Sequence, residues 1–370
     1  MRYIIIGAGA VGGTIGARLL RAGHEVVLVA RGAHYAALRD RGLRFATPAD
    51  TVTLEAPVVA GPGELSLRAD DALILAVKTQ DSAAALDAWA WQPVAEGGTA
   101  AEELPLFCAQ NGVASERLAL RRFRNVYGVC VWLPATHLEP GVIEAQGTPM
   151  TGLLPVGRYP AGADETAGKV AADLARSTFL APVSAAVMRY KYRKLLGNLG
   201  NAVEALCGPR SAVSEHSETA AELRNRAREE GAAVLDAAGI DYASRAEQDE
   251  MRADQVRLEP VGGAHRSGGS SWQSLTRGTG SIEADYLNGE IVLLGRERGI
   301  PTPLNELLQR LANQFARHGR APGSITASEV ALLMQQASSG KAGVTRPGRE
   351  RGRQRTLPCA GPGNPAVHTP

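Results

Sequence analysis

The sequence of 370 residues predicts an α/β fold, with an N-terminal Rossmann-type doubly wound sheet followed by an all-α C-terminal domain. Residues 2–31 follow the order strand, glycine turn, helix and strand. Short apolar runs then alternate with helical stretches, which is typical of a parallel sheet covered on both faces. From about residue 185 to residue 336 the pattern is helical throughout. We therefore expect domains over residues 1–184 and 185–338, and a disordered basic tail over residues 339–370.

The first turn of the chain carries three glycines at the spacing of a dinucleotide-binding motif. Gly7 permits the tight turn, Gly9 lets the backbone approach a pyrophosphate, and Gly12 lets the helix pack closely on the strand. The N-terminus of the following helix would bind phosphate oxygens through its free N–H groups. The predicted cofactor-binding residues of this turn are Gly7, Ala8, Gly9, Ala10, Val11 and Gly12. The alternative is a glycine-rich turn without a ligand. The elements around the turn are expected at residues 3–6 (strand), 11–22 (helix) and 25–29 (strand).

The end of the second strand indicates which cofactor binds. NAD-specific sites have Asp or Glu there to bind the ribose 2′-hydroxyl, whereas this chain has Arg31, and Asp40 is the first acidic residue after Glu25. An arginine suits a 2′-phosphate because its guanidinium forms charge-assisted hydrogen bonds. We therefore predict NADPH as the cofactor, with a solvated surface arginine as the alternative.

Polar residues follow two further strands of the predicted sheet. Lys78 follows a strand expected over residues 73–77, and Asn111 follows one over residues 104–109. Because ligands of open α/β sheets lie beyond the carboxyl ends of the strands, both side chains should face the nicotinamide half of the cofactor. Alternatively, each is a loop residue that satisfies backbone groups. The remaining elements of this domain are expected as strands over residues 126–132, 142–144 and 153–157 and a helix over residues 165–177.

A helix that opens the second domain carries a polar stripe. Lysine is scarce in this chain, with five lysines against 35 arginines, and Lys191 and Lys194 fall together on this helix. A partly buried lysine can act as an acid near neutral pH, whereas arginine stays protonated. Relative to Lys194, Asn198 lies at about 40° and Asn201 at about −20° around a regular helix. The stripe therefore predicts one wall of a cleft, or else a set of residues that only bridges helices.

A second polar cluster follows a glycine-rich loop at residues 262–269, which together with Gly208-Pro209 interrupts the helical pattern. Ser270 and Ser271 come directly after this loop, where a helix start would present them. Glu283 and Asp285 precede an apolar helix expected over residues 286–294. Carboxylates at this position commonly serve only as partners of the helix dipole, so spacing alone leaves a catalytic role of Glu283 open.

Composition and charge exclude several classes of function. The six basic residues from Lys341 onward face Glu350 alone, so the rest of the chain has 34 basic and 37 acidic residues and lacks the positive excess of a nucleic-acid-binding protein. The tail is expected to be inert, with contact to RNA or an acidic surface as the alternative. No apolar run approaches the roughly 18 residues of a membrane span. The four cysteines form no CxxC pair, so we predict no metal site and a cytoplasmic location.

Five segments together resemble a known family. GAGAVG, AVKTQD, AQNGVAS, RKLLGN and SSWQSLTRGTGSIEADYLNG occur in the order found in 2-dehydropantoate 2-reductases (ketopantoate reductases), over about residues 1–311. The resemblance implies a Rossmann domain and a helical domain with the active site between them. It also implies reduction of ketopantoate by NADPH to pantoate, on the route to coenzyme A.

The resemblance also implies roles for single residues. Lys194 matches the catalytic lysine, which would protonate the keto oxygen as hydride reaches the carbon, and Asn111 and Asn198 would hold the oxygen or the lysine. Ser271 would bind the substrate carboxylate, and Glu283 would accept a hydrogen bond from the substrate hydroxyl. Arg31 and Lys78 match basic residues on the cofactor side. His137, in a loop after a strand, is a rival proton donor that no carboxylate pairs with in the sequence.

One departure from the family concerns the substrate. The family usually has an asparagine eight residues after the lysine, whereas this chain has Ala202 there and Asn201 beside it. The alternative functions are therefore a reductase of the same fold acting on another 2-oxo acid or an imine, and a dinucleotide-sensing protein without turnover. The expected partner is a small 2-oxo acid, and a homodimer is one assembly compatible with the sequence.

Overall fold

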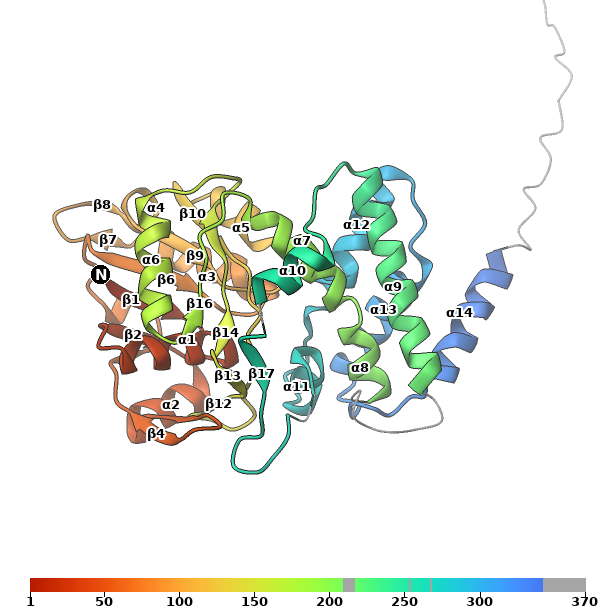
Figure 1. Ribbon diagram of the computed structural model, residues 1–370, viewed down its shortest axis with the longest axis horizontal. Coiled ribbons are helices and arrows are strands. Elements are labelled where there is room, and N and C mark those ends of the chain that lie inside the picture. The colour runs from red at the N-terminus through yellow and green to blue at the C-terminus, as the bar shows by residue number, and fades with distance from the viewer. Residues whose placement is uncertain (209–216, 253, 267, 342–370) are drawn as a thin grey trace, which may run out of the picture.

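The computed structural model describes residues 1–208, 217–252, 254–266 and 268–341. These residues form an α/β part, drawn in red to yellow in Figure 1, and a helical part, drawn in green to blue beside it. The fold class predicted from the sequence is confirmed. The division between residues 184 and 185 stays a prediction, and it falls between the last strand of the α/β part and the first helix of the helical part.

A seven-stranded sheet forms the centre of the α/β part. Every neighbouring pair of strands is parallel except the pair at one edge, β10 and β15. The strand order reverses on either side of β1, which pairs with both β2 and β6. In sheet order the strands are β15 (Val156–Arg158), β10 (Asn125–Val129), β9 (Pro105–Cys108), β6 (Asp71–Leu75), β1 (Arg2–Ile6), β2 (Val26–Val29) and β5 (Val58–Val59).

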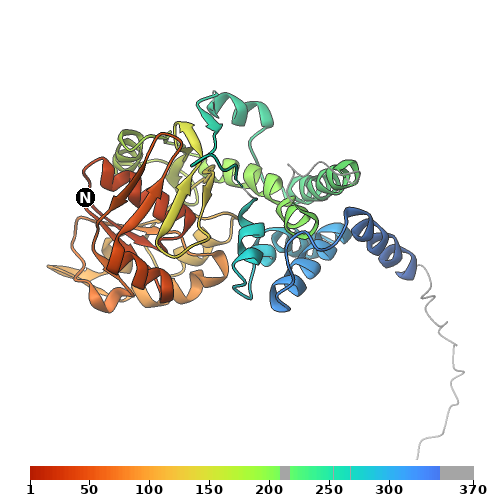
Figure 2. The ribbon, with the colours of Figure 1, turned by 90° about the horizontal axis from the view of Figure 1, so that it is seen from below.

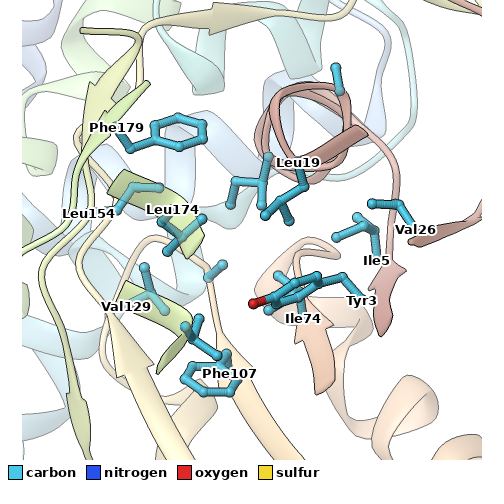
Figure 3. Packing of buried hydrophobic residues seen from close by; sticks show 14 of the residues in the cluster. Tyr3, Ile5, Leu19, Val26, Ile74, Phe107, Val129, Leu154, Leu174 and Phe179 are labelled. Carbon is cyan, nitrogen blue, oxygen red and sulfur yellow. The ribbon is translucent and has the colours of Figure 1, made fainter. Parts of the chain in front are cut away.

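Helices cover both faces of this sheet. Successive side chains of a strand point to opposite faces, and both sets are apolar here, so each face needs a covering layer. Tyr3 and Ile5 pack on the face that α1 and α6 cover, and Figure 3 shows this packing against Leu19 and Phe179. The alternate residues of β1 belong to the core on the other face. The helices of this part are α1 (Ala10–Arg21), α2 (Gly32–Arg41), α3 (Ser82–Ala90), α4 (Ala100–Glu103), α5 (Ser115–Leu120) and α6 (Glu165–Arg176), with short 3-10 turns η1 (Pro62–Glu64) and η2 (Thr79–Asp81).

Smaller sheets complete the α/β part. The strand expected over residues 142–144 is present, but it belongs to a separate four-stranded sheet of β11 (Ala135–Thr136), β12 (Val142–Ala145), β3 (Leu43–Ala46) and β4 (Thr51–Leu54). The run expected as one strand over residues 153–157 is divided into two strands, because Pro155 has no N–H to donate. Three two-stranded sheets pair β7 (Pro93–Val94) with β8 (Gly97–Thr99), β14 (Gly152–Leu153) with β16 (Phe179–Leu180), and β13 (Gly147–Pro149) with β17 (Val256–Leu258).

The helical part has its own apolar core, in which side chains such as Leu195, Ile291 and Phe315 are fully buried. Its elements are α7 (Val187–Asn198), α8 (Asn201–Cys207), α9 (Ser217–Ala237), α10 (Arg245–Arg252), α11 (Ser270–Thr276), η3 (Glu283–Tyr286), α12 (Asn288–Arg298), α13 (Pro303–Arg317) and α14 (Ala327–Lys341). One strand, β17, interrupts the helices, since it pairs with β13 of the other part. In Figure 2 the chain of α10 and β17 rises away from the helices toward the sheet.

The polar stripe lies on two helices and not on one regular helix. The carbonyl of Leu199 accepts a hydrogen bond from Asn288 Nδ2 at 3.0 Å, and α7 ends at the residue before it. Helix α8 then ends at Cys207, and the next residue, Gly208, has a φ of 102°, which lies in the region that favours glycine. Pro209, the other residue of that predicted break, lies outside the described residues.

The end of the described chain differs slightly from the expectation. Helix α14 continues to Lys341, so it includes the first residues of the tail expected over 339–370, and the remainder of that segment lies outside the described residues. Among the helices that the structure describes, none is long and apolar enough to cross a membrane.

Candidate active site

A cavity of about 710 Å³ is lined by residues of both parts of the protein. It lies at the carboxyl ends of β1, β2, β6 and β9, beside the point where the strand order of the sheet reverses, which is where open α/β sheets bind ligands. Helices α7, α8 and α11 line it from the helical part. The sequence-predicted residues in its walls are Gly7, Ala8, Gly9, Ala10, Val11, Arg31, Lys78, Asn111, Lys194, Asn198, Asn201 and Glu283.

The glycine turn after β1 leaves room for a ligand. Gly7 has φ +100°, and a Cβ atom there would lie 2.7 Å from the backbone nitrogen of Val77. A Cβ atom on Gly12 would lie 2.2 Å from the carbonyl oxygen of Gly7, so Gly12 permits close packing and does not line the cavity. Above Gly9, a Cβ atom would approach only one described atom, His137 Nδ1 at 3.7 Å. With no acidic residue in the first turn of α1, this space and the helix N-terminus suit a pyrophosphate.

Arg31 lies between β2 and α2, directly before the first residue of α2. Its side chain is exposed and lines the cavity, and no other described residue forms an ion pair with it. The structure therefore leaves its guanidinium available to an anion at the end of β2.

Lys78 and Glu283 are joined across the cavity wall. Lys78 Nζ donates to Glu283 Oε2 at 2.6 Å, and Glu283 Oε1 accepts from the backbone N and the hydroxyl of Thr79, each at 3.2 Å. The Glu283 side chain is 5% exposed. The cofactor-side lysine and the substrate-side carboxylate predicted from the sequence are thus direct partners, and their pairing ties η3 of the helical part to the end of β6.

The turn that carries Asn111 is held by its neighbours. Gln110 Nε2 donates to the carbonyl oxygen of Val77 at 2.7 Å and to Ser82 Oγ at 2.8 Å, and the Asn111 carbonyl accepts from Thr79 Oγ1 at 3.3 Å. The side-chain oxygen of Asn111 is buried without a hydrogen-bond partner among the described residues. The turn is therefore fixed while its amide remains free for a ligand.

The polar stripe expected on one helix lies along α7 and α8 and lines the cavity. Lys194, Asn198 and Asn201 all line it, and the stripe continues on α8 to Glu204. Lys194 is half-buried, and burial lowers the pKa of its ammonium to about 8, with a contribution from the nearby positive charge of Arg266. Ala202 is 3% exposed in the core of the helical part. The position of the family's second asparagine is therefore a core position in this chain.

Lys191, on the same helix as Lys194, does not line the cavity. Its ammonium forms an ion pair with Glu116 of α5, in which neither side chain has more than 1% of its surface exposed. It also donates to the carbonyl oxygen of Gln110 at 3.1 Å. Lys191 thus joins the helical part to the turn that carries Asn111.

The two serines at the start of α11 occupy different environments. Ser270 lines the cavity, and its hydroxyl oxygen is buried without a partner among the described residues. Ser271, the serine that the family resemblance implicates, is 5% exposed and is not among the residues that line the cavity. In this structure Ser270 is the serine that faces the site.

His137 and Arg277 meet beside the glycine turn. Arg277 Nη1 lies 3.3 Å from His137 Nδ1, and the backbone N of His137 donates to Gln273 Oε1 at 3.3 Å. Burial, with the neighbouring His34 and Arg277, lowers the pKa of His137 to about 3. The imidazole is therefore neutral near pH 7 and is a poor proton donor.

Several polar atoms of the cavity have no partner among the described residues, although each is buried. A buried donor or acceptor without a hydrogen bond is costly, so such atoms mark where a ligand's polar groups would bind. These atoms are Asn111 Oδ1, Asn198 Nδ2, Ser270 Oγ, Arg266 Nε and Arg277 Nε. In the described part of the chain, no group of three or more His, Cys, Asp or Glu residues is placed to hold a metal ion.

Sequence models of one family match both parts of the chain. The model described as "Ketopantoate reductase PanE/ApbA" matches residues 3–159, and the model described as "Ketopantoate reductase PanE/ApbA C terminal" matches residues 186–316. This chain belongs to the ketopantoate reductase family. The family expected from the five sequence segments is confirmed, and the chain is an oxidoreductase of the ketopantoate reductase type.

Individual ketopantoate reductases are similar over nearly their whole length. The 2-dehydropantoate 2-reductase of Halobacterium salinarum is 27% identical over 326 residues, which cover 86% of this chain and 100% of the relative. That of Pyrococcus horikoshii is 23% identical over 312 residues, covering 84% of this chain and 96% of the relative.

Solved structures share the fold. A PanE/ApbA family ketopantoate reductase from Ralstonia eutropha superposes with a TM-score of 0.68 at 27% identity, covering 86% of this chain and 100% of that one. A D-mandelate dehydrogenase, solved with NADH and anilino(oxo)acetate, superposes with a TM-score of 0.71 at 22% identity, covering 87% of this chain and 100% of that one. At that identity the likeness to D-mandelate dehydrogenase shows the fold alone.

Sequence reasoning missed several residues that line the cavity. Arg266 comes from the glycine-rich loop, which was interpreted only as a break between helices, and Glu204, Gln273 and Arg277 had no role assigned. Glu204 continues the spacing of the stripe, so extending that pattern by one turn would have found it. Nothing in the local pattern distinguishes Arg266 from the many other arginines of the chain.

Proposed function

We propose that this protein reduces 2-dehydropantoate (ketopantoate) to pantoate with NADPH, in pantothenate and coenzyme A biosynthesis, with Lys194 as the general acid. The observation that carries the proposal is the position of Lys194. It is a half-buried lysine in a cavity at the ends of the Rossmann strands, with the unpartnered amides of Asn111 and Asn198 in the same walls.

The residues of the cavity suit the cofactor. The free space over Gly9 and the N-terminus of α1 would hold the pyrophosphate, and Arg277 of the helical part lies beside that turn through its contact with His137. The guanidinium of Arg31, which has no ion-pair partner among the described residues, would bind a 2′-phosphate, which favours NADPH over NADH. Bound NADPH supplies the hydride that reduces the keto carbon.

The protein's own groups would handle the charge that develops on the keto oxygen. With a pKa of about 8, Lys194 is mostly protonated at neutral pH yet releases its proton more readily than an exposed lysine. Its proton would go to the keto oxygen as the hydroxyl forms. Asn198 Nδ2 would donate a hydrogen bond to that oxygen, and Asn111 Oδ1 would accept one from the ammonium of Lys194. His137 lacks an acidic proton near pH 7, which argues against it as the donor.

Reduction of another 2-oxo acid is the second candidate. It is favoured by the shift of the second asparagine, since Ala202 is buried in the helical core and Asn201 lines the cavity in its place. A sensor without turnover is disfavoured, because binding a dinucleotide alone requires neither Lys194 nor the free amides around it.

The test is NADPH oxidation, measured with the full chain against a panel of 2-oxo acids that includes ketopantoate and against one imine substrate. The proposal expects ketopantoate to have the highest kcat/KM. A higher value for another 2-oxo acid would support the second candidate, and NADPH binding without turnover of any substrate would support the sensor.

Variants of Lys194 test the mechanism in the same assay. General acid catalysis typically contributes about 10²–10⁴-fold, so Lys194→Ala should lower kcat by at least the smaller factor while NADPH binding changes little. Lys194→Arg should restore little activity, because arginine keeps the charge but does not release its proton. Lys169→Ala, on the exposed side of α6, is the matched control. Near-normal turnover by Lys194→Arg would refute the role of the lysine as an acid.

A further inference from the structure

Arg266 lines the cavity with a guanidinium for which the described residues offer no hydrogen-bond or ion-pair partner. It lies between β17 and α11, it is half-buried, and its Nε is buried without a hydrogen-bond partner among the described residues. The other two cavity arginines of the helical part each have a contact, since Arg252 Nε donates to the Val256 carbonyl at 3.1 Å and Arg277 Nη1 lies 3.3 Å from His137 Nδ1, although Arg277 Nε also lacks a partner among the described residues. A buried donor without an acceptor is costly, and a positively charged donor is best satisfied by an anion. The guanidinium of Arg266 therefore indicates an anionic ligand.

The loop that carries Arg266 is fixed in place by α8. The backbone N of Gly269 donates to Glu204 Oε1 at 3.1 Å, and a Cβ atom on Gly269 would lie only 2.7 Å from Glu204 Oε2. Glu204 thus fixes the loop. It forms no ion pair with Arg266 within the described residues, but its charge opposes the burial that lowers the pKa of the guanidinium. The guanidinium keeps its positive charge and its free donor.

Arg266 shares the cavity with Lys194. Both residues line it, and the charge of Arg266 adds to the effect of burial in lowering the pKa of Lys194. Asn198 Nδ2 and Ser270 Oγ, both buried without partners among the described residues, line this same cavity. Two neighbouring cations and these free polar atoms suit a ligand that has a carboxylate on the carbon next to a keto group.

We propose that Arg266 binds the carboxylate of the substrate, a 2-oxo acid, and so places the adjacent keto oxygen at Lys194. This assignment rests on the proposed reductase function and names a residue that determines its specificity. The guanidinium would donate two parallel hydrogen bonds to the carboxylate, and Ser270 would donate a further one. Ser271, which the family resemblance implicates in this role, does not line the cavity.

The experiment compares a 2-oxo acid with its neutral primary amide, using the full chain. Truncating one partner of a buried, hydrogen-bonded charge pair should lower kcat/KM for the acid by at least roughly 30-fold in Arg266→Gln, mainly through KM. The amide has no carboxylate to lose, so its kcat/KM should change by less than about threefold. The dissociation constant of NADPH, measured by quenching of its fluorescence, should stay the same.

Two further variants control for structure and charge. Arg257→Gln removes an exposed arginine of β17 outside the cavity and should leave every value unchanged. Arg266→Lys keeps the charge but not the paired donors, so it should recover part of the activity with the acid. The kcat/KM of the protein should fall at alkaline pH as Lys194 loses its proton. Arg266→Gln should shift this fall to higher pH, because the ammonium of Lys194 then loses a repulsive positive charge.

Three results would overturn the assignment. Equal losses for the acid and the amide would show that Arg266 supports the fold and not the carboxylate, and weaker NADPH binding would assign it to the cofactor. If the unmutated protein reduces no 2-oxo acid, the proposed function fails. The role of Arg266 is then tested separately by the binding of oxamate, which carries a carboxylate, to the protein–NADPH complex. Oxamate binding that Arg266→Gln abolishes would support the carboxylate site, and no oxamate binding to the unmutated protein would refute it.

Discussion

The buried ion pair between Lys191 and Glu116 should be one of the main links between the two parts of the protein. Neither side chain has more than 1% of its surface exposed, and the pair joins α7 to α5. Lys191 Nζ also donates to the carbonyl oxygens of Gln110 at 3.1 Å and Cys108 at 3.5 Å. Substitution Lys191→Met removes the ammonium while keeping a side chain of similar length, so it isolates the loss of these interactions.

The size of the expected loss of stability follows from the buried charge that Lys191→Met leaves without a partner. The carboxylate of Glu116 would stay buried without its cation, and its Oε2 already has no partner among the described residues. Removing one partner of a buried ion pair destabilises a protein by about 3–5 kcal/mol. For a unit of about 150–250 residues each kcal/mol shifts Tm by roughly 2–4 °C, so Tm should fall by about 6–20 °C.

Differential scanning calorimetry of the full chain, at fixed protein concentration and without cofactor, measures this shift. Lys169→Met, on an exposed position of α6, is the matched control and should change the free energy of unfolding by no more than about 0.5 kcal/mol. The double variant Lys191→Met with Glu116→Gln should lose less than Lys191→Met alone, because no uncompensated charge stays buried. A Tm for Lys191→Met equal to that of Lys169→Met would refute this reasoning.

Three further predictions concern the cofactor, the pH profile and the tail. Arg31→Ala should remove most of the preference for NADPH over NADH. The ratio of the two kcat/KM values should fall by roughly 10–150-fold, because a hydrogen bond to a charged group contributes about 1.5–3 kcal/mol. Equal kcat/KM with both cofactors in the unmutated protein would contradict this prediction. Lys194 can donate a proton only while it is protonated. The value of kcat/KM for the keto substrate should therefore be constant below the lysine's pKa of about 8 and fall above it. A profile that stays flat to pH 10 would exclude Lys194 as the acid. Truncation after Gly340 should leave Tm and NADPH turnover unchanged, because the removed tail is poor in apolar residues. A large drop in either value would show that the tail contacts the rest of the protein.

Local features of the fold could be predicted from the sequence because their causes are local. The order of β1, glycine turn and α1 follows from an apolar run and from Gly7, whose φ of +100° other residues rarely adopt. Lys78 and Asn111 line the cavity because each follows a strand of one parallel sheet. Lys194 and Asn198 share a face because they are four residues apart on a helix.

The partners of these residues depend on contacts between distant segments, which no local pattern encodes. Lys78 and Glu283 are 205 residues apart and Lys191 and Glu116 are 75 apart, yet each pair is in direct contact. A periodic pattern shows which face of an element is buried, but not which element covers it. For the same reason β12 could be predicted as a strand and not as a neighbour of β3.

The sequence by itself therefore determined the family, the Rossmann sheet and the stripe that carries Lys194. Only the tertiary structure decided which polar side chains face the cavity. Ser270 and Ser271 are adjacent and chemically identical, but the first turn of α11 turns one toward the cavity and the other into the protein. Arg266 reaches the cavity because Glu204 holds its loop there. The direction of a side chain in a loop is set by the elements packed around it, and these come from other parts of the chain.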